Sequence, residues 1–502
     1  MKTLYDILTE YGESDVYPYH MPGHKRNGGQ NTESFFQEYN KRDITEIDGF
    51  DNLHHPEGIL KDAMERAAGL YRSQKTYFLI NGSTAGVLTS IMAAVPRHGS
   101  LIMMRNSHRS AYHGLMLGEM KGIYLMSDAH PATGLDLGVT YAQIMDAVEQ
   151  HPEAGAVFLT SPTYEGLSMP LKDIAEALHK RNIILIVDAA HGAHFGMADY
   201  LPENAVTAGA DMVIHSLHKT LPSPTQTALL HINGDRVDIS RVERYLSVFQ
   251  SSSPSYVLMA GIDECIRIIR EEGRELWRTF YENRRVLYHK LKDLKHIRIL
   301  DAFSSAAENT MQPEMGKMLL IPDERYMTAK ELYDTLRLKY HLQPEMVTSA
   351  YVLIFLTVMD TGEGYHRLAE ALREIDHDLE TKCDLNAGRE FQAVNTDKNV
   401  NNNGNKCFIK ALMPNVLYTI GEACEMEGEW VSAEMASGRV SREFVMVYPP
   451  GQPILAPGEK ITEQIIQSIS KNLLYGCNVI GIQNYEEELN TFQLLCIRDC
   501  RE

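Results

Sequence analysis

The sequence predicts an α/β fold in which a mostly parallel sheet carries helices on both faces, with a small α+β domain and a C-terminal α+β domain after it. Two observations predict this. Between about residues 61 and 235, short apolar runs alternate with helical segments such as LKDIAEALHKR, which is typical of a covered parallel sheet. Beyond that region one long helical stretch, at about 255–294, is followed by mixed helical and strand patterns.

Five parts are expected along the chain. Residues 1–60 are rich in Tyr, His, Pro and Gly and show little periodicity, which indicates an arm lying over other structure. A large ligand-binding domain, a small α+β domain, an asparagine-rich linker and a C-terminal domain are expected at 61–300, 301–390, 391–406 and 407–502. In the large domain the predicted strands are the runs TYFLI, LIMM, IYLM, AVFLT, IILIVD and MVIH.

Composition excludes several classes of function. The formal net charge of -19, with no basic run to offset it, opposes binding to nucleic acid or to an anionic membrane. The seven cysteines are widely spaced and form no CxxC pair, so neither a disulfide framework nor a zinc cluster is indicated. A reducing cytoplasm is the expected location, because the sequence has neither a signal-peptide core nor an apolar stretch of membrane-spanning length.

Polar side chains follow five of the predicted strands. In a parallel α/β sheet the ligand binds at the carboxyl ends of the strands, so these residues are the candidates for a site. They supply hydroxyls, imidazoles, one carboxylate and one lysine, in the stretches Asn81–Gly86, Asn106–His108, Ser161–Tyr164, Asp188–His191 and Ser216–Lys219.

The stretch NGSTAG, at residues 81–86, is expected to be a small loop between a strand and a helix. Its backbone N–H groups and hydroxyls at a positive helix end suit a phosphate. It has neither the Walker spacing nor GxGxxG, and an ordinary turn explains it as well.

Asp188 ends the most apolar strand of the chain, where an unpaired carboxylate would be unfavourable. It is therefore expected to face a cation or hydrogen-bond donors, although a helix N-cap is the alternative. His191 and His194 have the HxxH spacing found in some metal sites, but no further ligand completes a recognisable set, so no metal is predicted. His108 is a further candidate site residue, although it can equally be a structural histidine that is hydrogen-bonded at a strand end.

Lys219 stands in HSLHKTLPSPTQ, directly after a predicted buried strand. A lysine, a phosphate loop, an acid for a cationic nitrogen, and imidazoles on one rim match the needs of pyridoxal 5'-phosphate, with the lysine as the Schiff-base residue. Pro222 and Pro224 predict that a shaped loop, rather than a helix, presents Lys219. The alternative is a surface loop that happens to contain a lysine.

Several sequence motifs, taken together and in their order along the chain, resemble those of a known enzyme family. HMPGHK, DNLHHPEGIL, NGSTAG, NSHRS, SPTYEG, VDAAHGAHF, SLHKTLPSPTQ and ASGRVSREFVMVYPPGQPI run through almost the whole sequence. In these motifs the chain resembles the ornithine/lysine/arginine decarboxylases of the aspartate-aminotransferase fold, which are enzymes of pyridoxal-phosphate fold type I. It looks most similar to their shorter biosynthetic branch, the arginine decarboxylases.

The resemblance implies roles for individual residues. Lys219 would be the cofactor lysine, Asp188 the partner of the pyridine nitrogen, and His108 the histidine stacked on the ring. His191 would lie near the ring hydroxyl, and His218 near both the phosphate and the reacting carbon. Further cofactor contacts are expected from Ser83, Thr84, Ala85, Thr163 and Ser216.

The implied reaction is decarboxylation of a basic amino acid, with arginine giving agmatine for polyamine biosynthesis. A homodimer or larger homo-oligomer is expected, with the arm around residues 20–25 covering the site. Glu434 is a candidate carboxylate for a guanidinium, although a solvated surface glutamate is its plainer interpretation. Lysine or ornithine as substrate stays open, as does another pyridoxal-phosphate enzyme of this fold, such as an aminotransferase or an α-oxoamine synthase. A non-catalytic regulator is disfavoured because Lys219 and Asp188 are both present.

Overall fold

The computed structural model describes residues 2–15, 22, 36–130, 133–300, 312–386, 413–448 and 451–498. The chain forms two compact units. The first comprises Met1–Leu125, Thr140–Pro162 and Ser168–Trp277, and the second comprises Met126–Val139, Thr163–Leu167 and Arg278–Glu502. The arm motif HMPGHK falls outside the described residues except for Pro22, so its covering role stays a prediction.

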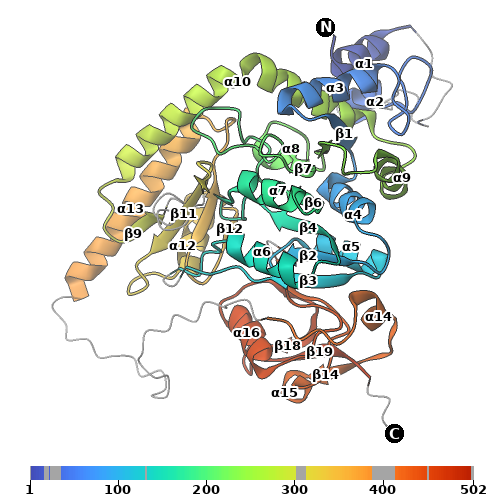
Figure 1. Ribbon diagram of the computed structural model, residues 1–502. Helices are drawn as coiled ribbons and strands as arrows, with labels where there is room; N and C mark the ends of the chain where they lie inside the picture. The colour runs from blue at the N-terminus through green and yellow to red at the C-terminus, as the bar shows by residue number, and fades with distance from the viewer. Residues whose placement is uncertain are drawn as a thin grey trace. The chain divides into compact units, whose positions relative to one another are not determined.

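The first unit is built on a seven-stranded sheet in the order β1-β8-β7-β6-β4-β2-β3. The strands from β7 to β3 in this order are parallel, whereas β8 is antiparallel to both of its neighbours. Figure 1 draws these strands in blue to green. Their bounds are Lys75–Leu79 (β1), Ser100–Met104 (β2), Lys121–Leu125 (β3), Ala154–Thr160 (β4), Ile184–Asp188 (β6), Met212–Ser216 (β7) and Ala228–Ile232 (β8).

Burial explains why these strands are apolar without alternation. Every residue of β2, β7 and β8 is buried, which is the pattern of strands covered on both faces. All six predicted strands of the large domain are present. The sequence analysis did not predict β8, which pairs antiparallel with β7 from Met212 to Ser216.

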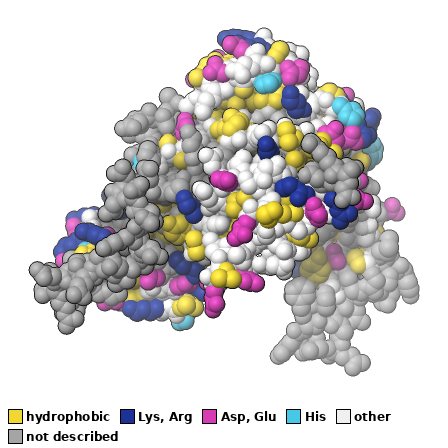
Figure 2. Space-filling model, turned by 90° about the horizontal axis from the view of Figure 1, so that it is seen from below, with side chains coloured by type: hydrophobic (Ala, Val, Ile, Leu, Met, Phe, Trp, Pro, Cys, Tyr) yellow, Lys and Arg dark blue, Asp and Glu magenta, His cyan; other side chains and the backbone are white. Residues whose placement is uncertain are grey.

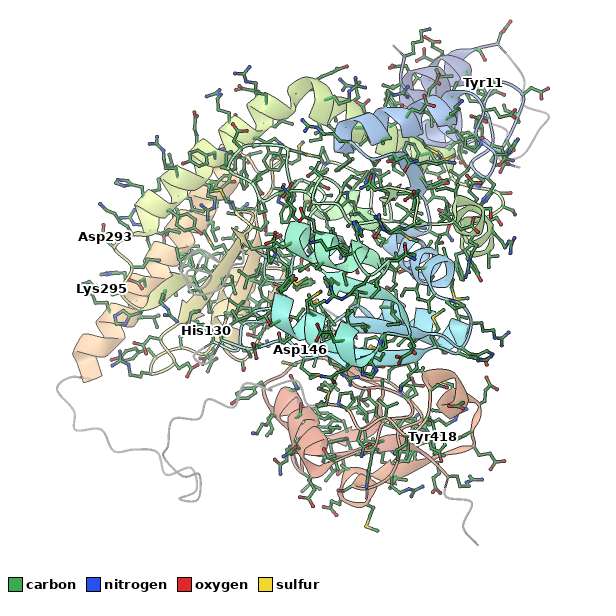
Figure 3. The ribbon with its side chains drawn as sticks, in the orientation of Figure 1. Tyr11, His130, Asp146, Asp293, Lys295 and Tyr418 are labelled. Carbon is green, nitrogen blue, oxygen red and sulfur yellow. The ribbon has the colours of Figure 1, made fainter. Side chains whose placement is uncertain are left out.

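Ten helices are assigned to the first unit or begin in it, among the described residues. Two of them, α1 (Leu4–Glu13) and α2 (Phe36–Arg42), lie within the expected arm, where the sequence analysis predicted no regular structure. A capping box formed by Thr3 and Asp6 begins α1. In Figure 3 Tyr11 marks this helix, and its ring packs edge-on against Phe50. The other helices are α3 (Ile59–Tyr71), α4 (Gly82–Ala94), α5 (Arg109–Gly118), α6 (Tyr141–Gln150), α7 (Leu171–His179), α8 (Leu217–Thr220), α9 (Ile239–Phe249) and α10 (Tyr256–Leu291).

The second unit contains a four-stranded sheet with the order β12-β13-β11-β9, all of it antiparallel. The buried carboxylate of Asp376 accepts hydrogen bonds from the backbone N–H groups of Lys295, His296 and Ile297, and so ties α13 to the start of β9. Figure 3 labels Lys295. The elements are β9 (Ile297–Leu300), β11 (Lys317–Pro322), α12 (Ala329–Leu338), β12 (Met346–Val347), β13 (Val352–Phe355) and α13 (Gly362–Asn386).

The C-terminal part of this unit has two three-stranded sheets, ordered β14-β19-β18 and β16-β15-β17. One apolar core joins them, with Val445, Leu455, Ile469 and Leu494 almost wholly buried. The elements are α14 (Ile420–Glu425), β14 (Gly428–Ser432), α15 (Ala433–Ala436), β15 (Val445–Val447), β16 (Gln452–Leu455), α16 (Glu463–Leu474), β17 (Val479–Ile480), β18 (Ile482–Glu486) and β19 (Thr491–Ile497); the two-residue strands β5 (Leu167–Ser168) and β10 (Gln312–Pro313) lie outside these sheets.

The surface is polar and mixed in charge. Figure 2 shows acidic and basic side chains interspersed with apolar ones on the face that it draws. Within the described part of the chain, every helix is too short or too polar to traverse a lipid bilayer.

Candidate active site

The carboxyl ends of the parallel strands bring most of the predicted site residues to one edge of the large sheet. Asp188 ends β6 and Ser216 ends β7, while His108 follows β2. Strand register places Thr160 of β4 opposite Asp188, and Asp188 opposite Ile214 of β7. The first unit thus holds nine of the eleven predicted residues, namely Ser83, Thr84, Ala85, His108, Asp188, His191, Ser216, His218 and Lys219.

Lys219 lies in the one-turn helix α8. The expected loop is therefore wrong at this position, because Pro222 and Pro224 fall after the helical turn and end it rather than prevent it. The Nζ atom of Lys219 is 3.0 Å from Nε2 of His191, which comes three residues after β6. The amine therefore lies beside an imidazole at the strand edge, and once deprotonated it can react with a carbonyl carbon.

Asp188 is buried, with 5% of its surface exposed, and its Oδ1 accepts a hydrogen bond from the backbone N–H of Ala190 at 3.1 Å. Burial raises the pKa of this carboxyl, while the positive charge of Lys219 and the hydrogen bond act against that rise. Because a nearby positive charge favours its ionised form, the Asp188 carboxylate can in turn stabilise a cationic nitrogen placed beside it.

His218 donates a hydrogen bond from Nδ1 to the carbonyl oxygen of Thr227, over 3.0 Å. Burial lowers its pKa, and the charge of Lys219 lowers it further against the hydrogen bond to Thr227. In its neutral form the ring thus carries its proton on Nδ1, which makes Nε2 an acceptor.

His108 caps the N-terminus of α5. Its Nδ1 accepts hydrogen bonds from the backbone N–H of Ser110 at 3.3 Å and from the Ser110 hydroxyl at 2.8 Å. Burial first, and then the charges of Lys219 and Arg109, lower the pKa of His108 to about 4. Its ring is therefore neutral at physiological pH, with its proton on Nε2.

The stretch NGSTAG forms the first turns of helix α4 rather than a separate loop, with Asn81 at the N-cap. Gly82 has a φ of +74°, and a Cβ atom on Gly86 would lie 2.6 Å from the Leu79 side chain. The first glycine therefore permits the turn into the helix, and the second lets α4 pack closely against β1.

The hydroxyl of Ser83, in the first turn of α4, hydrogen-bonds the hydroxyl of Ser216 at the end of β7. Thr84 is exposed, whereas Ala85 is buried. Together with the unpaired N–H groups of a helix N-terminus, two facing hydroxyls form a site suited to a phosphate.

Thr163 and Glu434 belong to the second unit. Thr163 is buried and closes a tight turn, because its backbone N–H donates to the Leu167 carbonyl at 2.8 Å and its Oγ1 accepts from Leu167 N–H at 3.2 Å. Glu434 lies exposed in the first turn of α15. Their expected contacts with cofactor and substrate stay predictions.

Sequence reasoning missed three buried polar residues behind this edge, namely Tyr71, His215 and His231. Each of the two histidines interrupts an otherwise apolar strand, in MVIHS and ALLHI, and that interruption was the available signal. It was overlooked because MVIH was interpreted as an apolar strand and ALLHI was not predicted to be a strand.

A separate cavity of about 470 Å³ contains none of the predicted site residues. It lies between the HHP stretch, α3, the edge strand β1 and α9, and Glu243 there pairs with Lys75 over 2.6 Å. Its lining includes Leu53, His54, His55, Met64, Thr76, Tyr77, Phe78, Leu246 and Gln250. The chemistry of the strand edge and this cavity are therefore distinct features.

Comparison with known proteins covers nearly the whole chain. The sequence is 28% identical over 483 residues to an arginine decarboxylase of Bacillus anthracis, spanning 95% of this chain and 94% of that relative. It is 31% identical over 502 residues to the uncharacterised protein YaaO of Bacillus subtilis, spanning 97% of each. Among solved structures, lysine decarboxylase A of Pseudomonas aeruginosa matches with a TM-score of 0.80 and 20% identity, over 99% of this chain and 80% of that one.

That structural likeness confirms the predicted α/β fold of the aspartate-aminotransferase type. The family model for the major domain of Orn/Lys/Arg decarboxylases matches residues 2–370, and the model for their C-terminal domain matches residues 405–473. The chain belongs to the Orn/Lys/Arg decarboxylase family.

Proposed function

We propose that this amino-acid decarboxylase acts on L-arginine, uses pyridoxal 5'-phosphate, and releases agmatine and carbon dioxide. The observation that carries the proposal is the contact of Lys219 with His191 at an edge that also holds the buried Asp188. Cytoplasmic location and a place in polyamine biosynthesis belong to the same proposal.

The residues present fit the cofactor by their chemistry. The amine of Lys219 matches an aldehyde, the N-terminus of α4 with Ser83 and Ser216 matches a phosphate, and Asp188 matches a protonated pyridine nitrogen. The neutral ring of His108 can stack on the cofactor without adding charge. When bound, the cofactor accepts the electron pair that the departing carboxylate leaves behind.

The chain's own residues supply the proton chemistry. His218, held through Nδ1 by Thr227, presents Nε2 as an acceptor that can take and return a proton. Lys219 is the second candidate proton donor at this edge. Either His218 or Lys219 returns a proton to the α-carbon of the substrate. The variant His218→Gln tests which of the two it is. Loss of proton return would lower kcat while leaving cofactor affinity nearly unchanged.

Arginine is the proposed substrate because the curated relative from Bacillus anthracis, at 28% identity, is an arginine decarboxylase. Lysine and ornithine are the alternatives, since the family as a whole acts on all three. A guanidinium is planar with five donors and is best recognised by a carboxylate, and Glu434 is the candidate for that role. A homodimer, with the arm around residues 20–25 covering the site, is part of the proposal.

The test measures kcat/KM for arginine, lysine and ornithine, each followed by its amine product. The kcat/KM for arginine should be about tenfold higher or more than for the other two. The shorter amines would leave buried hydrogen-bond acceptors of the pocket unpaired. Preference for lysine or ornithine would refute the arginine assignment. Formation of a keto acid without carbon dioxide would instead favour an aminotransferase.

Two variants test the pocket. Glu434→Gln should lower the preference for arginine, while Glu463→Gln should not, because Glu463 is likewise exposed in the first turn of a helix but has no proposed role. An unchanged preference in Glu434→Gln removes Glu434 from the pocket and leaves the decarboxylase proposal intact.

A further inference from the structure

A buried polar network lies behind the strand edge that carries Lys219. It consists of Tyr71 at the end of α3, His215 in β7 and His231 in β8, all at most 4% exposed. Nδ1 of His215 is 3.0 Å from Nε2 of His231, and Nδ1 of His231 is 2.8 Å from the hydroxyl of Thr76 in β1. The Tyr71 ring contacts both imidazoles, with centroids 4.9 Å and 4.6 Å apart. Three neighbouring strands are thus joined by side chains as well as by their backbone ladder.

The direction of each hydrogen bond follows from burial. Burial lowers the pKa of His231 to about 3 and that of His215 well below its usual value, so both rings are neutral. Nε2 of His215 is buried and has no hydrogen-bond partner among the described residues. A proton there would be an unsatisfied buried donor, so His215 carries it on Nδ1 and donates to His231. His231 then donates from Nδ1 to Thr76, and the hydroxyl of Thr76 is 2.6 Å from that of Ser73.

The network reaches Lys219 by two routes. Along the chain, His215 directly precedes Ser216, whose hydroxyl meets Ser83. Through space, the hydroxyl of Tyr71 donates to the carbonyl oxygen of Ala193 over 2.8 Å, and Ala193 is two residues from His191. Burial raises the pKa of Tyr71 well above its usual value, so the hydroxyl stays a donor.

The segment between His191 and Ala193 has little room to move. A Cβ atom on Gly192 would lie 2.9 Å from Cδ of Pro162, so Pro162 blocks one side of the turn. Backbone hydrogen bonds from Gly192 N–H to Ala189 and from Phe195 N–H to Gly192 close the turn. The hydrogen bond from the Tyr71 hydroxyl holds the carbonyl group of Ala193 at the end of this segment.

We infer that Tyr71, held by His215 and His231, is a positioning residue that keeps His191 in contact with Lys219 and thereby sets the affinity for the cofactor. The inference rests on the proposed function, because it concerns the lysine that would bind pyridoxal phosphate. Tyr71 acts through the Ala193 carbonyl and touches neither cofactor nor substrate in this account. His215 and His231 act one step further away, by fixing the ring of Tyr71.

The experiment measures the affinity of the full-length apoprotein for pyridoxal 5'-phosphate by equilibrium dialysis, and its thermal unfolding without cofactor. Tyr71→Phe removes only the hydroxyl, and should weaken cofactor affinity about three- to tenfold. His215→Phe keeps a ring against Tyr71 but breaks the bond to His231, and should weaken affinity less. Tyr256→Phe is the matched control, because Tyr256 is also fully buried and donates to the carbonyl oxygens of Phe50 and Asp51.

A double-mutant cycle with His191→Ala separates positioning from general stability. If Tyr71 acts through His191, Tyr71→Phe should weaken affinity no further in the His191→Ala background. Equal affinity losses in Tyr71→Phe and Tyr256→Phe, or full additivity with His191→Ala, would overturn the inference while leaving the proposed function standing. Failure of the wild-type apoprotein to bind the cofactor would refute the proposed function, and the inference with it.

Discussion

Lys219 and Lys317 are both withdrawn from solvent, and they are held in different ways. Lys219 is partly buried in α8, and its Nζ atom is 3.0 Å from Nε2 of His191. Lys317, in β11, is 2% exposed, and its Nζ atom lies 3.0 Å from the centroid of the Phe355 ring. The first lysine belongs to the proposed site, whereas the second is enclosed by packing.

The surroundings of Lys317 show how a buried lysine becomes structural. Gly166 has a φ of +99°, and a Cβ atom there would lie 2.6 Å from Cγ of Lys317, so the chain turns tightly around its stem. The charge of Lys317 also acts on the buried carboxyl of Glu165, whose Oε1 accepts a hydrogen bond from Tyr351 at 2.8 Å. Burial alone therefore does not mark a reactive lysine. The neighbours differ between the two lysines, with an imidazole beside Lys219 and an aromatic ring and a carboxyl beside Lys317.

The contrast between the two lysines predicts the largest effect. Lys219→Ala should abolish decarboxylation, on the order of 10⁴-fold or more, because no other group supplies the attacking amine. Lys317→Met should retain cofactor binding and turnover but lower the free energy of unfolding by about 1–3 kcal/mol, since Glu165 loses a compensating charge. Assays of carbon dioxide release and urea unfolding measure both. Activity in Lys219→Ala would refute the proposed site.

The buried carboxyls of Asp188 and Glu165 extend the comparison. Asp188→Asn should keep the fold and bind cofactor, yet lower kcat on the order of 10²-fold or more, as losing one fixed electrostatic partner does elsewhere. Glu165→Gln should leave kcat within about threefold, because Glu165 contacts Tyr351 in the packed second unit. Steady-state kinetics give kcat for both variants. Equal losses of kcat would contradict the assignment of a catalytic role to one carboxyl and a structural role to the other.

Acid should lower the stability of the folded chain through His108, which lies near Lys219. His108 has a folded-state pKa of about 4, below its unfolded value of about 6.5. As pH falls from about 6.5 to 4, the unfolded chain takes up a proton that the folded chain does not, so stability falls, by roughly 1–2 kcal/mol for this partly exposed ring. In apoprotein, His108→Asn should reduce this loss while keeping an N-cap acceptor. Urea unfolding at pH 7 and pH 4.5 measures the free energy of unfolding of the wild type and the variant. An identical fall in both proteins would exclude His108 as the source.

Glu165 should change the stability in the opposite direction with pH. Burial, and then the negative charge of Asp136, raise the pKa of Glu165 to about 7, above its unfolded value near 4.5. The folded chain therefore holds a proton that the unfolded chain releases, and this contribution to stability is lost as pH rises from about 4.5 to 7. Glu165→Gln should remove that loss, whereas Glu463→Gln should not. Unfolding curves at pH 5 and pH 7.5 compare them, and parallel behaviour of all three proteins would contradict the prediction.

The sequence predicted the large sheet because each of its six foreseen strands carries its own local signature of apolar residues. It failed at β8, an antiparallel strand whose ALLHI pattern includes a histidine that finds its hydrogen-bond partners on the two neighbouring strands, at His215 of β7 and Thr76 of β1. It also failed at α8 and at the start of α4. There the proline and glycine positions allowed more than one local backbone conformation, and packing selected a helix.

For the site, the sequence by itself determined which chemical groups stand at the strand ends, because a strand's carboxyl end follows from its own pattern. Asp188, Ser216, Lys219 and His108 could be named on that basis alone. Only the tertiary structure decided their partners and protonation. The contact of Lys219 with His191, the hydrogen bond of His218 to Thr227, and the lowered pKa of His108 all depend on how separate segments pack together. Burial and charge compensation are properties of that assembled environment, and no local pattern records them.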